Sequence, residues 1–191
     1  MILLVRHGET EWNLAHRYQG WSDSPLTPRG VAQAEAIGRK LRELPDAIGV
    51  PVVASPLGRA RRTAELIQAA RADLTPIRFD ERLKEISIGA WDGLGHDEIE
   101  ALSPGIFDGD GRHEWYFRSQ DGETYDDFAG RIGAWLADTG DRATIAVAHG
   151  VVTRVLRGLY AGLRREVALS LPVSQDVIWR LTDGRIDEIA V

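Results

Sequence analysis

The sequence contains no cysteine. That absence excludes disulfide bonds, thiolate nucleophiles and the zinc or iron–sulfur sites that cysteine ligates. Long apolar runs are also absent: no stretch approaches the roughly 20 residues of a membrane span, and the apolar start of the chain is too short for the core of a signal peptide. We therefore expect a cytoplasmic protein without a membrane partner.

Positive charge is in short supply as well. The formal net charge is −6, whereas a nucleic-acid-binding protein meets the phosphate backbone with a basic surface. The sequence thus predicts no nucleic-acid partner, and any functional cluster of basic residues must be local. Lys40 and Lys84 are the only lysines, so the other residues counted as Lys or Arg are all arginine. Arginine is the side chain best shaped for bidentate contacts to phosphate or carboxylate.

The overall composition is that of an ordinary globular protein, with 191 residues of which 43% are hydrophobic and 27% charged. A chain of this length can bury roughly 70% of its unfolded surface. No internal repeat or linker divides it, so we expect one domain over residues 1–191. The irregular stretch at about residues 103–123 predicts a lid-like excursion over the active-site face.

Strand patterns alternate with helix patterns along the chain. The β-rich runs are Ile2–Val5, Pro51–Ala54, Pro76–Phe79 and Thr144–Ala148. Helical apolar spacing follows the stretch DGETYDDF and His149, and also the pairs Thr27-Pro28 and Ser55-Pro56, in which Thr27 and Ser55 are expected to cap a helix that proline begins. Asp183-Gly184, between two strand-like runs, is a typical hairpin turn. These patterns predict an α/β three-layer sandwich: a mostly parallel central sheet, helices on both faces, and one antiparallel edge strand or hairpin.

Basic side chains follow three of the predicted strands. Arg6 and His7 come after the first, Arg59 lies in the helix after the second, and His149 follows the run that ends at Ala148. Ligands of open parallel sheets meet the carboxyl ends of the strands, so these groups converge if the strands are neighbours. Such a cluster needs an anion. A phosphoryl group is the natural one, because the helices that start near Ser55 and at Gly150 add N–H donors.

His7 is the candidate nucleophile of this cluster. Neighbouring cations lower the pKa of a histidine, which leaves its imidazole neutral and nucleophilic. A proton donor for the leaving oxygen is also needed, and the stretch RLKEISIGAWDG offers two carboxylates. We prefer Glu85, because its apolar neighbours favour the protonated form, over Asp92, which lies in a glycine turn.

A metal centre is not expected. The five histidines show no HxH or HExxH spacing. The run His96-Asp97-Glu98 is more typical of the start of a helix than of a metal site. The sequence therefore predicts neither a metal nor another cofactor.

The chain resembles the histidine phosphatase superfamily, in particular its phosphoglycerate-mutase-like group. The stretch LVRHGETEWN resembles the signature of that family. Five further stretches resemble later family motifs in the same order: RYQGWSDSPLTPRG from Arg17, SPLGRARRTA from Ser55, RLKEISIGAWDG from Arg82, GETYDDFAGR from Gly122 and VAHGVVTRVL from Val147. Together they cover nearly the whole chain.

The resemblance implies a role for each site residue. It makes His7 the residue that is phosphorylated, makes Arg6, Arg59 and His149 the ligands of the transferring phosphoryl group, and makes Glu85 the proton donor. It also implies that Asn13, Gln19 and Gly20 line the substrate side of the pocket, beside Gly150. The partner would be a small phosphorylated metabolite, and the protein a monomer or homodimer.

The activity within the family is a choice between hydrolase and mutase. The cofactor-dependent phosphoglycerate mutases are longer and carry an Arg-Arg pair in the excursion and a lysine where this chain has His96. Here the excursion has separated arginines, Arg112 and Arg118. The pair Gln19-Gly20 and the stretch HDEI resemble the small broad-specificity phosphatases of the family instead. We therefore expect a metal-independent phosphomonoester hydrolase of the histidine acid phosphatase type, with a mutase as the alternative. A phosphate-binding regulatory module without turnover is a further alternative.

The excursion also contains His113, Trp115, Tyr116 and Phe117. These residues either form an apolar wall beside the leaving group or pack the lid onto the body. In the first case bulky or aromatic phosphomonoesters would be accepted.

Overall fold

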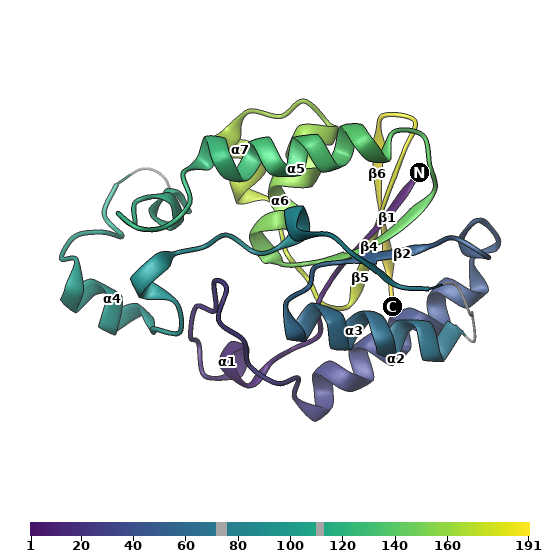
Figure 1. The fold of residues 1–191 in the computed structure, drawn as a ribbon, viewed down its shortest axis with the longest axis horizontal. Coiled ribbons are helices and arrows are strands. Elements are labelled where there is room, and N and C mark those ends of the chain that lie inside the picture. The colour runs from purple at the N-terminus through teal and green to yellow at the C-terminus, as the bar shows by residue number, and fades with distance from the viewer. Residues whose placement is uncertain (72–75, 110–112) are drawn as a thin grey trace.

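The computed structural model describes residues 1–71, 76–109 and 113–191. Its centre is a six-stranded sheet with the strand order β3-β2-β4-β1-β5-β6 (Figure 1). The strands are β1 Ile2–Arg6, β2 Val52–Ala54, β3 Arg78–Phe79, β4 Thr144–Ala148, β5 Val177–Thr182 and β6 Arg185–Ala190. The first four are parallel to one another, and β5 runs antiparallel to both of its neighbours.

Helices cover both faces of this sheet. The helices of the described residues are α1 Glu11–Leu14, α2 Pro28–Glu43, α3 Gly58–Arg71, α4 His96–Leu102, α5 Tyr125–Thr139, α6 Gly150–Tyr160 and α7 Arg165–Ser170. Those that cover the sheet are α2, α3, α5, α6 and α7. Alternate residues of β1 point to opposite faces: Leu3 packs with α2 and α3, and Leu4 packs with α5, α6 and α7. Figure 1 shows these two helix layers on either side of the strands. The predicted α/β sandwich is confirmed.

The edge hairpin also forms where the sequence predicts it. Asp183 and Gly184 join β5 to β6 with φ angles of 48° and 74°. Two consecutive residues with positive φ match the twist of the flanking strands, and glycine at the second position adopts that conformation without strain. One face of β5 is fully buried, and β6 is mostly exposed at the sheet edge.

The two predicted helix caps have different outcomes. Thr27 caps α2 as expected, because its Oγ1 accepts a hydrogen bond from the Gly30 N–H at 3.0 Å and Pro28 occupies the first helical position. The expectation that a helix starts at Ser55 was wrong. Helix α3 begins at Gly58, and the cap comes from a distant loop, where Asp23 Oδ1 accepts from the Arg59 N–H at 3.1 Å.

The excursion is tied to the body at several points. A short helical turn in it, Glu114–Phe117, carries Trp115, which is 5% exposed and contacts Tyr18 and Trp91. An ion pair between Glu114 and Arg165 fastens the turn to α7. Arg112 lies outside the described residues. No helix in the described part of the chain is long and apolar enough to cross a membrane.

Candidate active site

Three neighbouring strands end at the same place in the sheet. Strand β4 lies between β2 and β1. The backbone hydrogen bonds between these strands continue one residue beyond β1 and β2. The His7 N–H donates to the Ala148 carbonyl and the Ser55 N–H donates to the Val147 carbonyl, both at 2.9 Å. This pairing brings the residue after β1 beside the residue after β4, so the His7 and His149 rings lie 5.2 Å apart between centroids.

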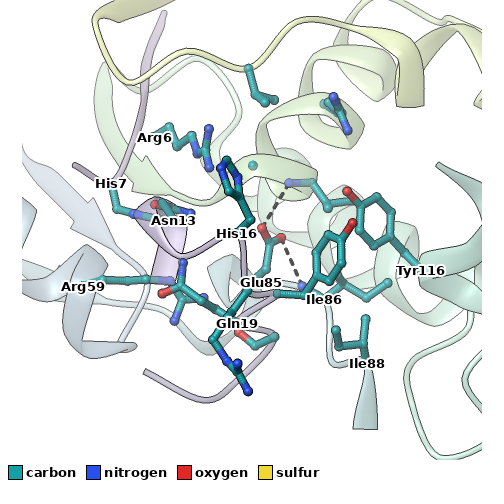
Figure 2. Close-up of a pocket in the computed structure, with 17 residues that line it drawn as sticks. Arg6, His7, Asn13, His16, Gln19, Arg59, Glu85, Ile86, Ile88 and Tyr116 are labelled. Carbon is teal, nitrogen blue, oxygen red and sulfur yellow. Dashed lines mark hydrogen bonds between the residues drawn. The ribbon is translucent and has the colours of Figure 1, made fainter. Parts of the chain in front are cut away.

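A cavity of about 300 Å³ opens at these strand ends. Most of the predicted site residues line it, namely Arg6, His7, Asn13, Gln19, Gly20, Arg59, Glu85 and Gly150. His149 is fully buried, and its ring lies beside that of His7, which lines the cavity. In the view of Figure 2, Arg6, His7 and Arg59 lie on one side of the Glu85 carboxylate, and Ile86, Ile88 and Tyr116 lie on the other.

The imidazole of His7 is held in one tautomer. Its Nδ1 lies 2.8 Å from the carbonyl oxygen of Gly8. A carbonyl only accepts, so Nδ1 carries the proton and Nε2 keeps its lone pair. Burial, and then the charges of Arg59 and Arg6, hold the pKa of His7 well below its ordinary value of 6.5. Burial is thus a larger cause of the neutral imidazole than the neighbouring cations from which the sequence predicts it, and the nucleophilic role of His7 stays a prediction.

Three residues from the three strand ends present buried polar atoms with no partner in the described structure. These atoms are Arg6 Nε, Arg59 Nε and His149 Nδ1. An unpaired polar atom in a protein interior costs about 1–3 kcal/mol, more when it is charged. Their occurrence together at one cavity fits a site built for an anion that supplies the missing acceptors.

His149 is oriented by a serine rather than by a carboxylate. Its Nε2 lies 2.7 Å from Ser55 Oγ. When the Ser55 hydroxyl donates to Nε2, the proton of the neutral ring sits on Nδ1, the atom without a partner. Burial lowers the pKa of His149 well below 6.5, and the charge of Arg59 adds to this. The ring can therefore act as a neutral donor toward an anion.

Arg59 connects the site to the loop before α2. Its Nη1 donates to the Ser22 carbonyl at 2.7 Å and forms an ion pair with Asp23 at 3.2 Å. Its Nη2 donates to the Gly20 carbonyl at 2.8 Å. These bonds engage both amino groups of the guanidinium and fix its direction. The Nε atom has no partner in the described structure.

Glu85 is anchored at the start of α6. Its Oε2 accepts from the Val151 N–H at 3.1 Å, and its Oε1 accepts from the N–H groups of Val152 at 3.3 Å and Ile86 at 3.1 Å. A Cβ atom placed on Gly150 would lie 3.7 Å both from Glu85 Oε2 and from Arg6 Nε. The carboxylate and the guanidinium thus border the same small space.

Asp92, the competing carboxylate, supports the loop instead. Its Oδ2 accepts from the backbone N–H groups of Trp21 and Ser22, at 2.9 and 3.3 Å. Burial raises its pKa, and these hydrogen bonds oppose the rise. Gly20 adopts φ +50° directly against this carboxylate, where a Cβ would come within 1.7 Å of Asp92 Oδ1. Asp92 does not line the cavity.

The remaining predicted residues approach from the loop that follows β1. Asn13 closes a capping box with Thr10 at the start of α1, and its Oδ1 also accepts from Gln175 Nε2 at 3.2 Å. The buried Gln19 presents an Oε1 without a partner in the described structure. Both amides face the cavity, as expected.

Sequence reasoning missed several lining residues, among them His16, Arg17, Tyr18, Val173 and Arg154. Arg154 lies four residues after Gly150, so the helical repeat returns it to the face that Gly150 presents to the cavity. That spacing could have identified it.

The aromatic residues of the excursion divide between the two roles considered for them. Tyr116 lines the cavity. Trp115 and Phe117 pack inward, against Tyr18 and Phe128 among others. Trp115 therefore packs the excursion onto the rest of the protein and does not form a wall of the cavity.

No group of three or more potential metal-ligating side chains occurs among residues 1–71, 76–109 and 113–191. The donors at the cavity are dominated by arginine and histidine, with a single carboxylate. This donor set suits an anion.

Comparisons with known proteins agree with this geometry. The model of the histidine phosphatase superfamily (branch 1) matches residues 2–182. A probable phosphoglycerate mutase GpmB from Citrobacter koseri is 38% identical over 213 residues, covering 99% of this chain and 91% of that protein. YhfR from Bacillus stearothermophilus superposes with a TM-score of 0.81 at 33% identity, over 99% of this chain and 95% of that chain. The mycobacterial glucosyl-3-phosphoglycerate phosphatase Rv2419c, in complex with VO3, gives a TM-score of 0.79 at 27% identity, over 98% and 96% of the two chains.

Proposed function

The chain belongs to the histidine phosphatase superfamily, and we propose that it is a phosphomonoester hydrolase that works through a phosphohistidine at His7 without a metal. The observation that carries the proposal is the set of buried donors without partners on Arg6, Arg59 and His149, arranged around a histidine whose Nε2 is free. A transferring phosphoryl group, with three equatorial oxygens, would satisfy all of them.

In the first half-reaction the Nε2 lone pair of His7 attacks phosphorus in line with the bond to the leaving oxygen. The N–P bond forms as the P–O bond breaks, and the Glu85 carboxyl gives its proton to the leaving oxygen. The Gly8 carbonyl keeps the proton on Nδ1 and stabilises the positive charge that develops on the ring. Arg6, Arg59 and His149 hold the equatorial oxygens.

In the second half-reaction water attacks phospho-His7. The N–P bond breaks with its electron pair returning to Nε2, and the Glu85 carboxylate takes a proton from the water. The hydrogen bonds from Val151 and Val152 hold that carboxylate in place for both steps. The cycle ends with inorganic phosphate and the starting protonation states.

A mutase is the second candidate, because the GpmB relative is named a probable phosphoglycerate mutase. Two features support the hydrolase instead. His96 stands where the cofactor-dependent phosphoglycerate mutases carry lysine. Its ring stacks on that of Phe107, with 4.0 Å between the ring centroids, and does not line the cavity. Arg118 donates to the carbonyls of Ile106 and Asp108, which hold its guanidinium within the excursion.

The test is incubation with a panel of phosphomonoesters that includes 3-phosphoglycerate, with and without 2,3-bisphosphoglycerate. Free phosphate and isomerised product are both measured. We expect phosphate release that needs no bisphosphate and survives EDTA. Isomerisation without phosphate release would refute the hydrolase, and loss of activity in EDTA that added metal restores would refute the metal-free mechanism.

A further inference from the structure

Arg154 is a cation at the cavity that the reaction described above does not use. It lies in α6 and is half-buried, and its Nε donates to the Leu171 carbonyl at 2.8 Å. Within the described residues no carboxylate forms an ion pair with it, whereas Arg17 is paired with Glu98 at 3.1 Å and Arg59 with Asp23 at 3.2 Å. The bond from Nε fixes the guanidinium and leaves its two amino groups for other contacts.

Tyr116 lies beside this guanidinium, on a different element. Burial raises the pKa of the Tyr116 hydroxyl to about 12, and the charge and hydrogen bond of Arg154 oppose that rise. The phenol is therefore protonated at neutral pH. When Arg154 donates to its oxygen, the hydroxyl hydrogen remains available for a second acceptor. The ion pair between Glu114 and Arg165 holds the turn that carries Tyr116.

Tyr116 lies on the far side of Glu85 from Arg6 and His7 (Figure 2), and Arg154 contacts Tyr116 through a side-chain hydrogen bond. Arg154 is four residues, about 6 Å of helix rise, beyond Gly150, whose Cα adjoins both Arg6 and Glu85. Since Glu85 protonates the leaving oxygen in the proposed reaction, this side of the cavity receives the leaving alcohol.

We propose that Arg154 and Tyr116 bind a carboxylate on the leaving alcohol, so that the preferred substrates are phosphomonoesters of small hydroxy acids. The inference rests on the proposed function, because the role of Glu85 as proton donor places the leaving alcohol on this side of the cavity. The planar fork of a guanidinium matches a carboxylate, and its single positive charge balances one negative charge. A second phosphate, with up to two negative charges, would be only partly balanced, because Arg17, the remaining arginine of the cavity lining, is already paired with Glu98.

The test compares two substrates with the same three-carbon skeleton, 3-phosphoglycerate and glycerol 3-phosphate. We expect the wild-type protein to prefer the acid in kcat/KM. In Arg154→Gln that preference falls roughly 10- to 100-fold, which is the range for one charge-assisted hydrogen-bonded contact. In Tyr116→Phe it falls by a smaller factor. Equal losses on both substrates, or no loss on either, would overturn the inference.

Arg17→Gln is the matched control. It removes a positive charge from the same cavity, but that charge is already neutralised by Glu98. The ratio of the two kcat/KM values should stay close to that of the wild type. A change as large as in Arg154→Gln would show a general effect of charge in the cavity and would refute recognition by Arg154.

Binding gives a second readout that does not depend on turnover. Calorimetry in the His7→Ala background measures Kd for the same two compounds, with and without Arg154→Gln. The preference for the acid should again fall roughly 10- to 100-fold. If wild-type protein releases no phosphate but this ratio changes as stated, the hydrolase proposal fails and the carboxylate site stands. If the ratio does not change, the carboxylate site fails whatever the protein hydrolyses.

Discussion

The Glu85 carboxylate accepts a hydrogen bond from the backbone N–H of Val151 at 3.1 Å, although 66 residues separate the two in the chain. The bond fastens the proposed proton donor to the first turn of α6, the helix that begins directly after His149. The proposed donor and the proposed ligands of the phosphoryl group are thereby parts of one connected arrangement at the end of β4. Such fixed geometry supplies much of the rate enhancement in phosphoryl transfer.

Replacement of Glu85 by glutamine separates its two roles. The amide oxygen of glutamine still accepts from Val151, whereas the amide nitrogen in place of Oε1 cannot accept from Val152 and Ile86. That loss affects every substrate alike, but the missing acidic proton affects only substrates whose leaving group needs one. We expect kcat/KM for an alkyl phosphate to fall by about 100-fold or more, and kcat/KM for 4-nitrophenyl phosphate to fall far less, because nitrophenolate leaves without a proton. Equal losses on both substrates would contradict the role of proton donor.

Alanine at Gly150 would place a methyl group 3.7 Å from Arg6 Nε and from Glu85 Oε2. That distance is ordinary van der Waals contact, so the fold should tolerate the change while the phosphoryl site shrinks. We expect the inhibition constant for inorganic phosphate to rise roughly 10-fold, about 1.4 kcal/mol, with the melting temperature little changed. Gly130→Ala in α5, with nothing within 4 Å, is the control. Equal phosphate affinity in both variants would exclude the crowding.

Asp23 is predicted to act through Arg59. Its Oδ1 accepts both from the Arg59 backbone N–H and from Arg59 Nη1. Asp23→Ala removes the acceptor and should cost about 1 kcal/mol of unfolding free energy, as for a lost helix cap, together with a drop in kcat/KM. Asp23→Asn keeps an oxygen acceptor and should stay closer to wild type in both. Urea denaturation and steady-state kinetics measure the two effects, and identical behaviour of the two variants would argue against this linkage.

The buried histidines predict how stability depends on pH. Folding holds the pKa values of His7 and His149 well below 6.5. As the pH falls below 6.5, the unfolded chain binds protons that the folded chain does not, so stability is lost. Each histidine contributes a slope of up to about 1.4 kcal/mol per pH unit. We expect His149→Gln to flatten the curve of unfolding free energy against pH in this range, and an unchanged slope would contradict the assignment.

The sequence was sufficient for the sheet and for the convergence of Arg6, Arg59 and His149, because strand periodicity and the rule of carboxyl strand ends are local and topological signals. It could not show that Asp23 caps α3. That contact joins a loop to a helix 36 residues away, and no periodicity reports it. The same limit explains Ser55, which looked like a helix cap and instead orients His149 across the sheet.

The excursion shows the other limit of sequence reasoning. Tyr116 and Trp115 are adjacent aromatics in a segment without regular spacing, so nothing in the sequence could tell which faces the cavity. The structure answers this through burial, since Trp115 packs on Tyr18 and Trp91 while Tyr116 reaches the cavity. Arg154 is different. Its spacing from Gly150 can be read from the sequence, but the sequence does not show that no described carboxylate forms an ion pair with it.

In the proposed mechanism His7 Nε2 carries the phosphoryl group during turnover. Rapid acid-free quenching of wild-type protein with a phosphomonoester, followed by peptide mass spectrometry, should find an acid-labile phosphate on His7. His7→Ala should form no such species and should lose activity by at least about 1,000-fold, whereas His16→Ala, at the mouth of the same cavity, should still be phosphorylated. A phosphoenzyme that persists in His7→Ala would contradict the account.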